Sequence, residues 1–179
     1  MKLLRTIRLD PSDTFVFERA AEPGEWAVSG AFVFSDADPA ALQGKARSAF
    51  RAGFLGASSL GWSTLVQIVE ATDLDRDAAI GQLAQNLCEH FGAPDLDAAR
   101  NAAEEEFIFA ESLCHHDADT LIAVHRTAEQ GEIREAFRTL KPRNGPKPLR
   151  AFSFMDVEGE EDGPAEQVDL LNLGQGERR

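Results

Sequence analysis

The most restrictive feature of this chain is a pair of long segments with helical periodicity that are separated by only three residues. The first, residues 75–91, carries one apolar stripe, made of Ile80, Leu83, Ala84, Leu87, Cys88 and Phe91. Gly92 and Pro94 end it, and the second segment, residues 95–114, follows at once. A break this short requires the two helices to lie antiparallel. The sequence therefore predicts a helical hairpin.

Short apolar segments on both sides of this hairpin indicate strands. The expected strands are residues 2–9, 14–18, 26–34, 62–71, 121–125 and 149–157. The pairs Phe15/Phe17, Phe32/Phe34 and Phe152/Phe154 are each two residues apart, so extended strands would direct all three pairs into one core.

Two further segments are expected to be helical. Asp38-Pro39 is an N-cap followed by proline, and predicts a helix to about residue 52 that ends at Gly53. Its inward-facing residues are expected to be Leu42, Ala46, Ala49 and Phe50. Residues 133–141 have helical spacing, with a strand as the alternative.

These elements predict an α+β fold, with a mostly antiparallel sheet packed against the helical hairpin and one or two further helices. Residues 1–157 are expected to form a single domain. Residues 158–179 are expected to form an acidic tail with a short apolar docking segment, residues 168–173, which would dock on its own chain or on a second copy.

The N-terminus and the cysteine content indicate the cytoplasm. The first ten residues carry charges at positions 2, 5, 8 and 10, which interrupt any signal peptide, and no apolar run approaches the roughly 20 residues of a membrane span. Two cysteines provide no disulfide framework.

The net charge of −13 opposes non-specific binding to nucleic acid or to an anionic membrane. This charge is unevenly distributed, with −11 over residues 1–125, +4 over residues 126–150 and −6 over residues 151–179. We expect the basic segment to offer an anion- or partner-binding site, made of Arg126, Arg134, Arg138 and Lys141. The alternative is a solvated basic face, or one masked by residues 158–169.

All cysteines and histidines lie in residues 88–125. In an antiparallel hairpin Cys88 and Cys114 would be on the order of 25 Å apart along the axis, too far for one tetrahedral site. Both would then be buried as small apolar side chains. His115, His116 and His125, with a nearby carboxylate, could still hold zinc or iron. The alternative is that His115 and His116 are a solvated helix cap.

Two other segments carry residues of potential chemical interest. Glu106 falls among alanines on the apolar face of its helix, so it lies either at the rim of that face or buried with a raised pKa. The glycine-rich residues 53–61 lack the Lys-Ser/Thr ending and the following helix of a phosphate loop, which favours a mobile surface loop or a binding rim.

Residues 2–18, 61–66 and 134–142 resemble a small bacterial family of uncharacterised proteins over most of the chain. That family is associated with genes near a protein similar to biotin/lipoate-protein ligases, so the resemblance implies an accessory role. It carries over no catalytic residues.

The sequence therefore predicts a cytosolic accessory or partner-binding protein without its own catalytic activity and without a cofactor. Its partner would be a protein that the sequence does not identify, and a homo-oligomer is left open. The alternative function is a small metal-dependent enzyme or metal-binding protein that uses His115, His116 and His125.

Overall fold

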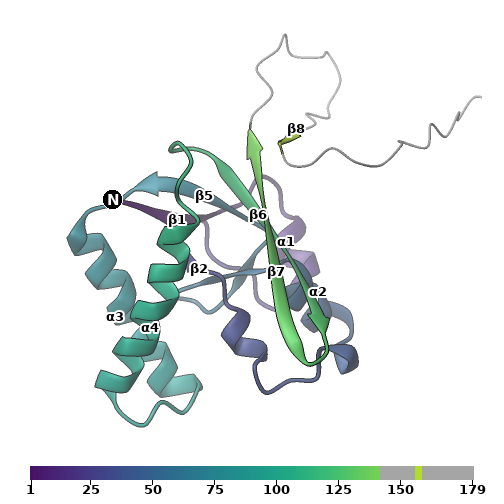
Figure 1. The fold of residues 1–179 in the computed structure, drawn as a ribbon, viewed down its shortest axis with the longest axis horizontal. Coiled ribbons are helices and arrows are strands. Elements are labelled where there is room, and N and C mark those ends of the chain that lie inside the picture. The colour runs from purple at the N-terminus through teal and green to yellow at the C-terminus, as the bar shows by residue number, and fades with distance from the viewer. Residues whose placement is uncertain (142–155, 159–179) are drawn as a thin grey trace, which may run out of the picture.

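The structure, a computed structural model, describes residues 1–141 and 156–158 (Figure 1). Its strands form one eight-stranded antiparallel sheet in the order β4-β3-β2-β1-β5-β6-β7-β8. The strands are β1 (Lys2–Ile7), β2 (Trp26–Val28), β3 (Phe54–Gly56), β4 (Trp62–Ser63), β5 (Leu65–Glu70), β6 (Leu121–Glu129), β7 (Glu132–Lys141) and β8 (Asp156–Glu158). The predicted α+β class is confirmed.

The helices are α1 (Ser12–Val16), α2 (Gly44–Ala52), α3 (Asp73–His90) and α4 (Leu96–Ser112), with 3-10 turns η1 (Ala31–Phe34) and η2 (Pro39–Ala41). Figure 1 shows α3 and α4 side by side at one end of the molecule, with α1 and α2 at the other. The predicted hairpin is therefore correct. Its helices begin at side-chain caps, because Thr72 accepts from the Asp75 N–H and Asp95 from the Ala98 N–H.

The sheet is strongly curled. Phe54 on β3 and Phe137 on β7 have ring centroids 6.1 Å apart, although β2, β1, β5 and β6 lie between these strands in the sheet. In a flat sheet, five steps of roughly 4.8 Å would separate the two strands by roughly 24 Å. The curl therefore brings the β6–β7 hairpin over β2, β3 and α2, and closes a core that contains the fully buried Phe54 and Phe107.

The predicted strand at residues 14–18 is wrong, because α1 occupies this segment. Asp13 is buried and accepts from the backbone N–H and the hydroxyl of Thr64 at 3.1 and 2.6 Å. The same contact interrupts the predicted strand at residues 62–71, which splits into β4 and β5. As a result Phe15 is 72% exposed whereas Phe17 is fully buried, so this pair does not share a core face.

The predicted strand at residues 26–34 ends early, after Val28. Gly30 has φ +80°, and a Cβ built there would lie 2.6 Å from the Leu55 Cβ, so the chain turns at a position that requires glycine. Phe32 and Phe34 consequently lie on a 3-10 turn. Phe34 is nevertheless buried, with its ring stacked 5.3 Å from Trp62. Phe152 and Phe154 lie outside the described residues.

The helix expected over residues 38–52 is broken in two. Asp38 does cap a turn with proline at its start, as predicted, but η2 ends at Ala41 and α2 begins only after Gln43 in an extended conformation. Ala49 and Phe50 are buried and Leu42 is half-buried, as predicted, whereas Ala46 is exposed, contrary to the expectation that it faces inward. The predicted end of this helix at Gly53 is confirmed.

Residues 133–141 form strand β7, so the helical interpretation is wrong and its alternative is correct. The reason is the turn before it. Gln130 and Gly131 have φ +53° and +82°, and Glu129 pairs with Glu132, which is a two-residue hairpin turn with both central residues in the left-handed region. None of the helices in the described part of the chain is long and apolar enough to cross a membrane.

Candidate functional site

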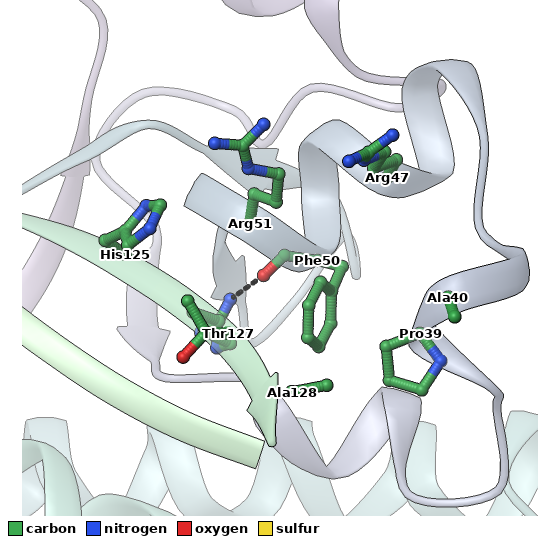
Figure 2. A pocket seen from close by; sticks show the side chains of 9 residues that line it. Pro39, Ala40, Arg47, Phe50, Arg51, His125, Thr127 and Ala128 are labelled. Atoms are coloured by element: carbon green, nitrogen blue, oxygen red, sulfur yellow. Dashed lines mark hydrogen bonds between the residues drawn. The ribbon is translucent and has the colours of Figure 1, made fainter. Parts of the chain in front are cut away.

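The main candidate site is a pocket of about 340 Å³ between α2, η2 and β6 (Figure 2). We call it the arginine pocket. It is lined by Pro39, Ala40, Arg47, Phe50, Arg51, His125, Arg126, Thr127 and Ala128. The curl of the sheet creates it, because the part of β6 beyond its pairing with β5 passes beside α2.

Three side chains give the arginine pocket its charge. Arg47 and Arg51 are four residues apart on α2, so they project from the same face of that helix. His125 comes from β6, and in Figure 2 Arg51 lies between His125 and Arg47. All three are exposed. Within the described residues none of the three side chains forms an ion pair or a hydrogen bond, so their donors are available to a ligand.

The remaining wall of the arginine pocket is mostly apolar. Phe50 is buried, with 4% of its surface exposed, and its ring faces the pocket together with Pro39, Ala40 and Ala128 (Figure 2). A ligand that fits this pocket therefore needs an anionic group beside an apolar part.

Arg126 was predicted to bind an anion, but its guanidinium is buried and fully used inside the protein. Nε donates to Glu135 Oε2 at 2.9 Å, Nη1 donates to the carbonyls of Phe50 and Gly53 at 3.1 and 2.7 Å, and Nη2 donates to the carbonyl and hydroxyl of Ser29. The bond to Phe50 is the dashed line in Figure 2. A guanidinium has five N–H donors, and all five are satisfied here. Arg126 is therefore a structural clasp beneath the pocket.

Arg134, Arg138 and Lys141 do not share a helical face, because they lie on a strand. Side chains alternate along β7, so Arg134 and Arg138 lie on one face and Lys141 on the other. Arg134 pairs with Thr127 and Arg138 with Ala123 across the ladder, which places both on the same face as His125. Arg134 forms an exposed ion pair with Glu129 at 2.9 Å. Arg134 and Arg138 therefore extend the basic surface of the arginine pocket along β7.

A carboxyl group lies close to the clasp on its inner side. Burial, with the nearby charges of Glu135 and Glu105, raises the pKa of Glu106 to about 7, while the positive charge of Arg126 acts in the opposite direction. Glu106 is only partly exposed, so the buried alternative is supported over the rim. Glu135 is held by Arg126 and by the Ser29 hydroxyl.

The histidines do not converge. His115 and His116 have ring centroids 4.1 Å apart and line a second pocket of about 250 Å³, with Leu113, Ile122, Phe137 and Thr139. His125 alternates with Ile122 and Val124 along β6 and so lies on the opposite face of the sheet. Burial is the main reason why the pKa of His116 is lowered. Within the described residues no group of three or more His, Cys, Asp or Glu side chains could hold a metal ion.

The two cysteines lie at opposite ends of the hairpin, as predicted. Cys88 lies near the hairpin loop, with Sγ 3.6 Å from the Asp95 carbonyl oxygen, and Cys114 follows the far end of α4. Cys88 is only partly buried, contrary to the prediction that both cysteines are buried. Cys114 is buried, and burial raises the pKa of its thiol to about 11.

Of the glycine-rich residues 53–61, Phe54–Gly56 form the buried strand β3, contrary to the prediction of a surface loop, and residues 57–61 form an anchored loop. Glu25 Oε2 accepts from the backbone N–H groups of Ser58 and Ser59 at 3.3 and 2.9 Å and from the Ser58 hydroxyl at 2.8 Å. The Asn86 amide donates to the carbonyls of Ala57 and Ser58. The loop therefore uses its polar groups internally.

Sequence reasoning missed Arg47 and Arg51. Their spacing on a predicted helix was the available signal, but nothing local indicates that His125, more than 70 residues further along, lies opposite them.

The chain was also compared with known proteins. A model described as a family of unknown function (DUF6505) matches residues 1–155, and so covers most of the sequence. No curated protein and no solved structure matches the chain. The family match agrees with the resemblance found in the sequence, and the chain belongs to this family of unknown function.

Proposed function

We propose that this chain is a cytosolic, partner-binding accessory protein that recognises an acidic group of a partner protein in the arginine pocket. The observation that supports this most is the presence of Arg47, Arg51 and His125 around one pocket, without ion-pair partners among the described residues. The chain as a whole carries a net charge of −13, so a cluster of unpaired basic groups is unusual for its composition.

The negative charge of the whole chain does not prevent local binding of an anion. At physiological ionic strength the Debye length is about 8 Å, so a carboxylate inside the pocket mainly senses the nearest charges. Those charges are the guanidinium groups of Arg47 and Arg51, which can each form paired hydrogen bonds with a carboxylate. Pro39, Ala40 and Ala128 supply apolar contact area beside them.

The proposal of binding rather than catalysis is supported by two side chains that could have acted as nucleophiles but are not placed to do so. The Cys114 thiol is buried with a raised pKa, and the Ser58 hydroxyl donates to Glu25. The assignment to the cytosol rests on the two free cysteines, Cys88 and Cys114.

Affinity purification from the native host tests the proposal when it is combined with charge reversal. The tagged wild-type chain is compared with Arg51→Glu and with Lys45→Glu, and recovered proteins are quantified by mass spectrometry. Lys45 is the matched control, since it is exposed on the same helix, has the same charge and does not line the pocket. We expect a partner that Lys45→Glu retains and that Arg51→Glu reduces at least about tenfold, a loss of about 1.4 kcal/mol. If Arg51→Glu and Arg47→Glu each recover this partner as well as the wild-type chain does, the proposal is contradicted.

A further inference from the structure

A second surface lies between the C-terminal half of α4 and strand β7, away from the arginine pocket. We call it the α4–β7 groove. It consists of Phe109 and the lining of the 250 Å³ pocket, namely Leu113, His115, His116, Ile122, Phe137 and Thr139. His125 is on the other face of β6, and the two pockets share no lining residue, so the two surfaces can be tested independently.

The α4–β7 groove exposes apolar side chains that the described residues do not cover. Phe109 is 39% exposed, and its ring contacts that of Phe137 edge-on with centroids 5.8 Å apart. Leu113 and Phe137 are only partly buried. Neighbouring aromatic and aliphatic side chains that stay partly exposed commonly mark a binding site for another apolar segment.

Strand β8 ends beside the groove, and an apolar segment follows it in the sequence. β8 pairs with the end of β7, and Glu158 is opposite Thr139, which itself lines the groove. Residues 159–179 follow, and their one apolar run is residues 168–173, Val-Asp-Leu-Leu-Asn-Leu. The ten steps from residue 158 to residue 168 can span roughly 33 Å, which is enough to reach any part of the groove.

Charge also favours this arrangement. Residues 159–167 carry four acids and no basic residue. At the groove, Lys2 donates from Nζ to the His116 carbonyl, and both Lys2 and Lys141 are close enough to His116 to lower its pKa, after the larger effects of burial and of His115. Positive charges therefore lie at the end of the sheet where β8 pairs with β7.

We propose that residues 168–173 dock in the α4–β7 groove of their own chain, with Val168, Leu170, Leu171 and Leu173 as the apolar anchors. Covalent attachment supports this occupant over a separate partner, because a short linker gives the segment an effective concentration in the millimolar range. The groove would then be closed in the free protein and would open only to a competing apolar segment.

A peptide-binding experiment tests this docking. The chain is truncated after Gly163, which keeps β8, and is titrated against a fluorescently labelled peptide of residues 165–176. We expect the peptide to bind the truncated chain, and to bind the full chain at least about tenfold more weakly because the groove is occupied. Phe109→Glu in the truncated chain should abolish binding, whereas Ile108→Glu, the exposed neighbour on α4, should not.

The outcomes separate the proposal from its alternatives. Loss of binding in a Leu170→Ala/Leu171→Ala peptide supports docking even if the Phe109→Glu chain fails to fold. Failure of the wild-type peptide to bind the truncated chain, or equal binding to truncated and full chains, would overturn it. A full chain that is dimeric while the truncated chain is monomeric would also overturn it, in favour of a second copy as the acceptor.

Discussion

Arg126 on β6 donates from Nε to Glu135 Oε2 on β7 at 2.9 Å, and the same guanidinium reaches back to Ser29 beside β2. Two strands, β1 and β5, separate β2 from β6 in the sheet. This one side chain therefore holds the curled sheet closed, and it fixes α2 beside β6 by binding the Phe50 and Gly53 carbonyls at the C-terminal end of that helix. The arginine pocket exists because of this closure.

Replacement of the clasp should strongly destabilise the fold. Arg126→Met keeps most of the side-chain length but leaves three carbonyls without a donor and Glu135 with the Ser29 hydroxyl in place of a charged partner, so we expect a loss of about 3–5 kcal/mol in the free energy of unfolding. The control is Arg138→Met, which removes an exposed charge and should change the free energy of unfolding by less than about 0.5 kcal/mol. Urea denaturation measures the free energy of unfolding of both variants. If Arg126→Met loses as little stability as Arg138→Met, Arg126 is not a clasp.

Glu106 should make the stability depend on pH. Its pKa in the folded chain is about 7, against a usual value of 4.5, so the folded state holds this proton more tightly than the unfolded state does. The contribution is therefore fully present below about pH 4.5 and is lost as the pH rises through 7, by up to about 3 kcal/mol. The free energy of unfolding, measured by denaturation, should be lower at about pH 7.5 than at about pH 5 in wild type. The difference should be smaller in Glu106→Gln. Glu105→Gln, at the exposed neighbouring position, is the control and should keep the wild-type pH dependence. If Glu106→Gln also keeps the wild-type pH dependence, this assignment is refuted.

Glu25 should determine the order of the glycine-rich loop. In Glu25→Ala the backbone amides of Ser58 and Ser59 lose their acceptor, so both should exchange with solvent deuterium at least about tenfold faster, as a lost hydrogen bond of about 1.4 kcal/mol implies. Glu18→Ala, at an exposed position without a hydrogen bond among the described residues, should leave these rates unchanged. Unchanged exchange in Glu25→Ala would mean that the loop is held by other contacts, such as those of Asn86.

The two cysteines should differ in reactivity. With a pKa of about 11, the Cys114 thiol is deprotonated to roughly one part in a thousand at pH 8, and it is buried as well. Cys88 is partly exposed. Iodoacetamide labelling followed by mass spectrometry should modify Cys88 in the folded chain and Cys114 only after unfolding in urea. Comparable labelling of both in the folded state would contradict the buried placement of Cys114.

The parts of this fold that the sequence predicts are those that local interactions determine. The hairpin α3–α4 follows from its apolar stripes, its caps at Thr72 and Asp95, and the break at Gly92. Strand β7 could also have been predicted from the sequence, because Gln130-Gly131 can form a two-residue turn. The helical spacing of the apolar residues in β7 obscured that signal.

The remainder depends on contacts between distant segments. The early end of β2 follows from the close approach of Gly30 to Trp62 and Leu55, and the helical turn α1 accompanies the Asp13–Thr64 contact. The site is less predictable still. Arg126 looks like an exposed base in the sequence and is buried, whereas Arg47 and Arg51 become a site only when the curl brings His125 beside α2.

The most direct test of the central claim is an NMR titration of the isotopically labelled chain with a hexaglutamate peptide, which imitates an acidic partner segment. The account predicts chemical-shift changes concentrated at Arg47, Arg51 and His125, retained in Lys45→Glu, abolished in Arg47→Glu/Arg51→Glu and weakened by salt. Changes that are absent, scattered over the surface or unaffected by the double charge reversal would contradict recognition of acidic groups in the arginine pocket.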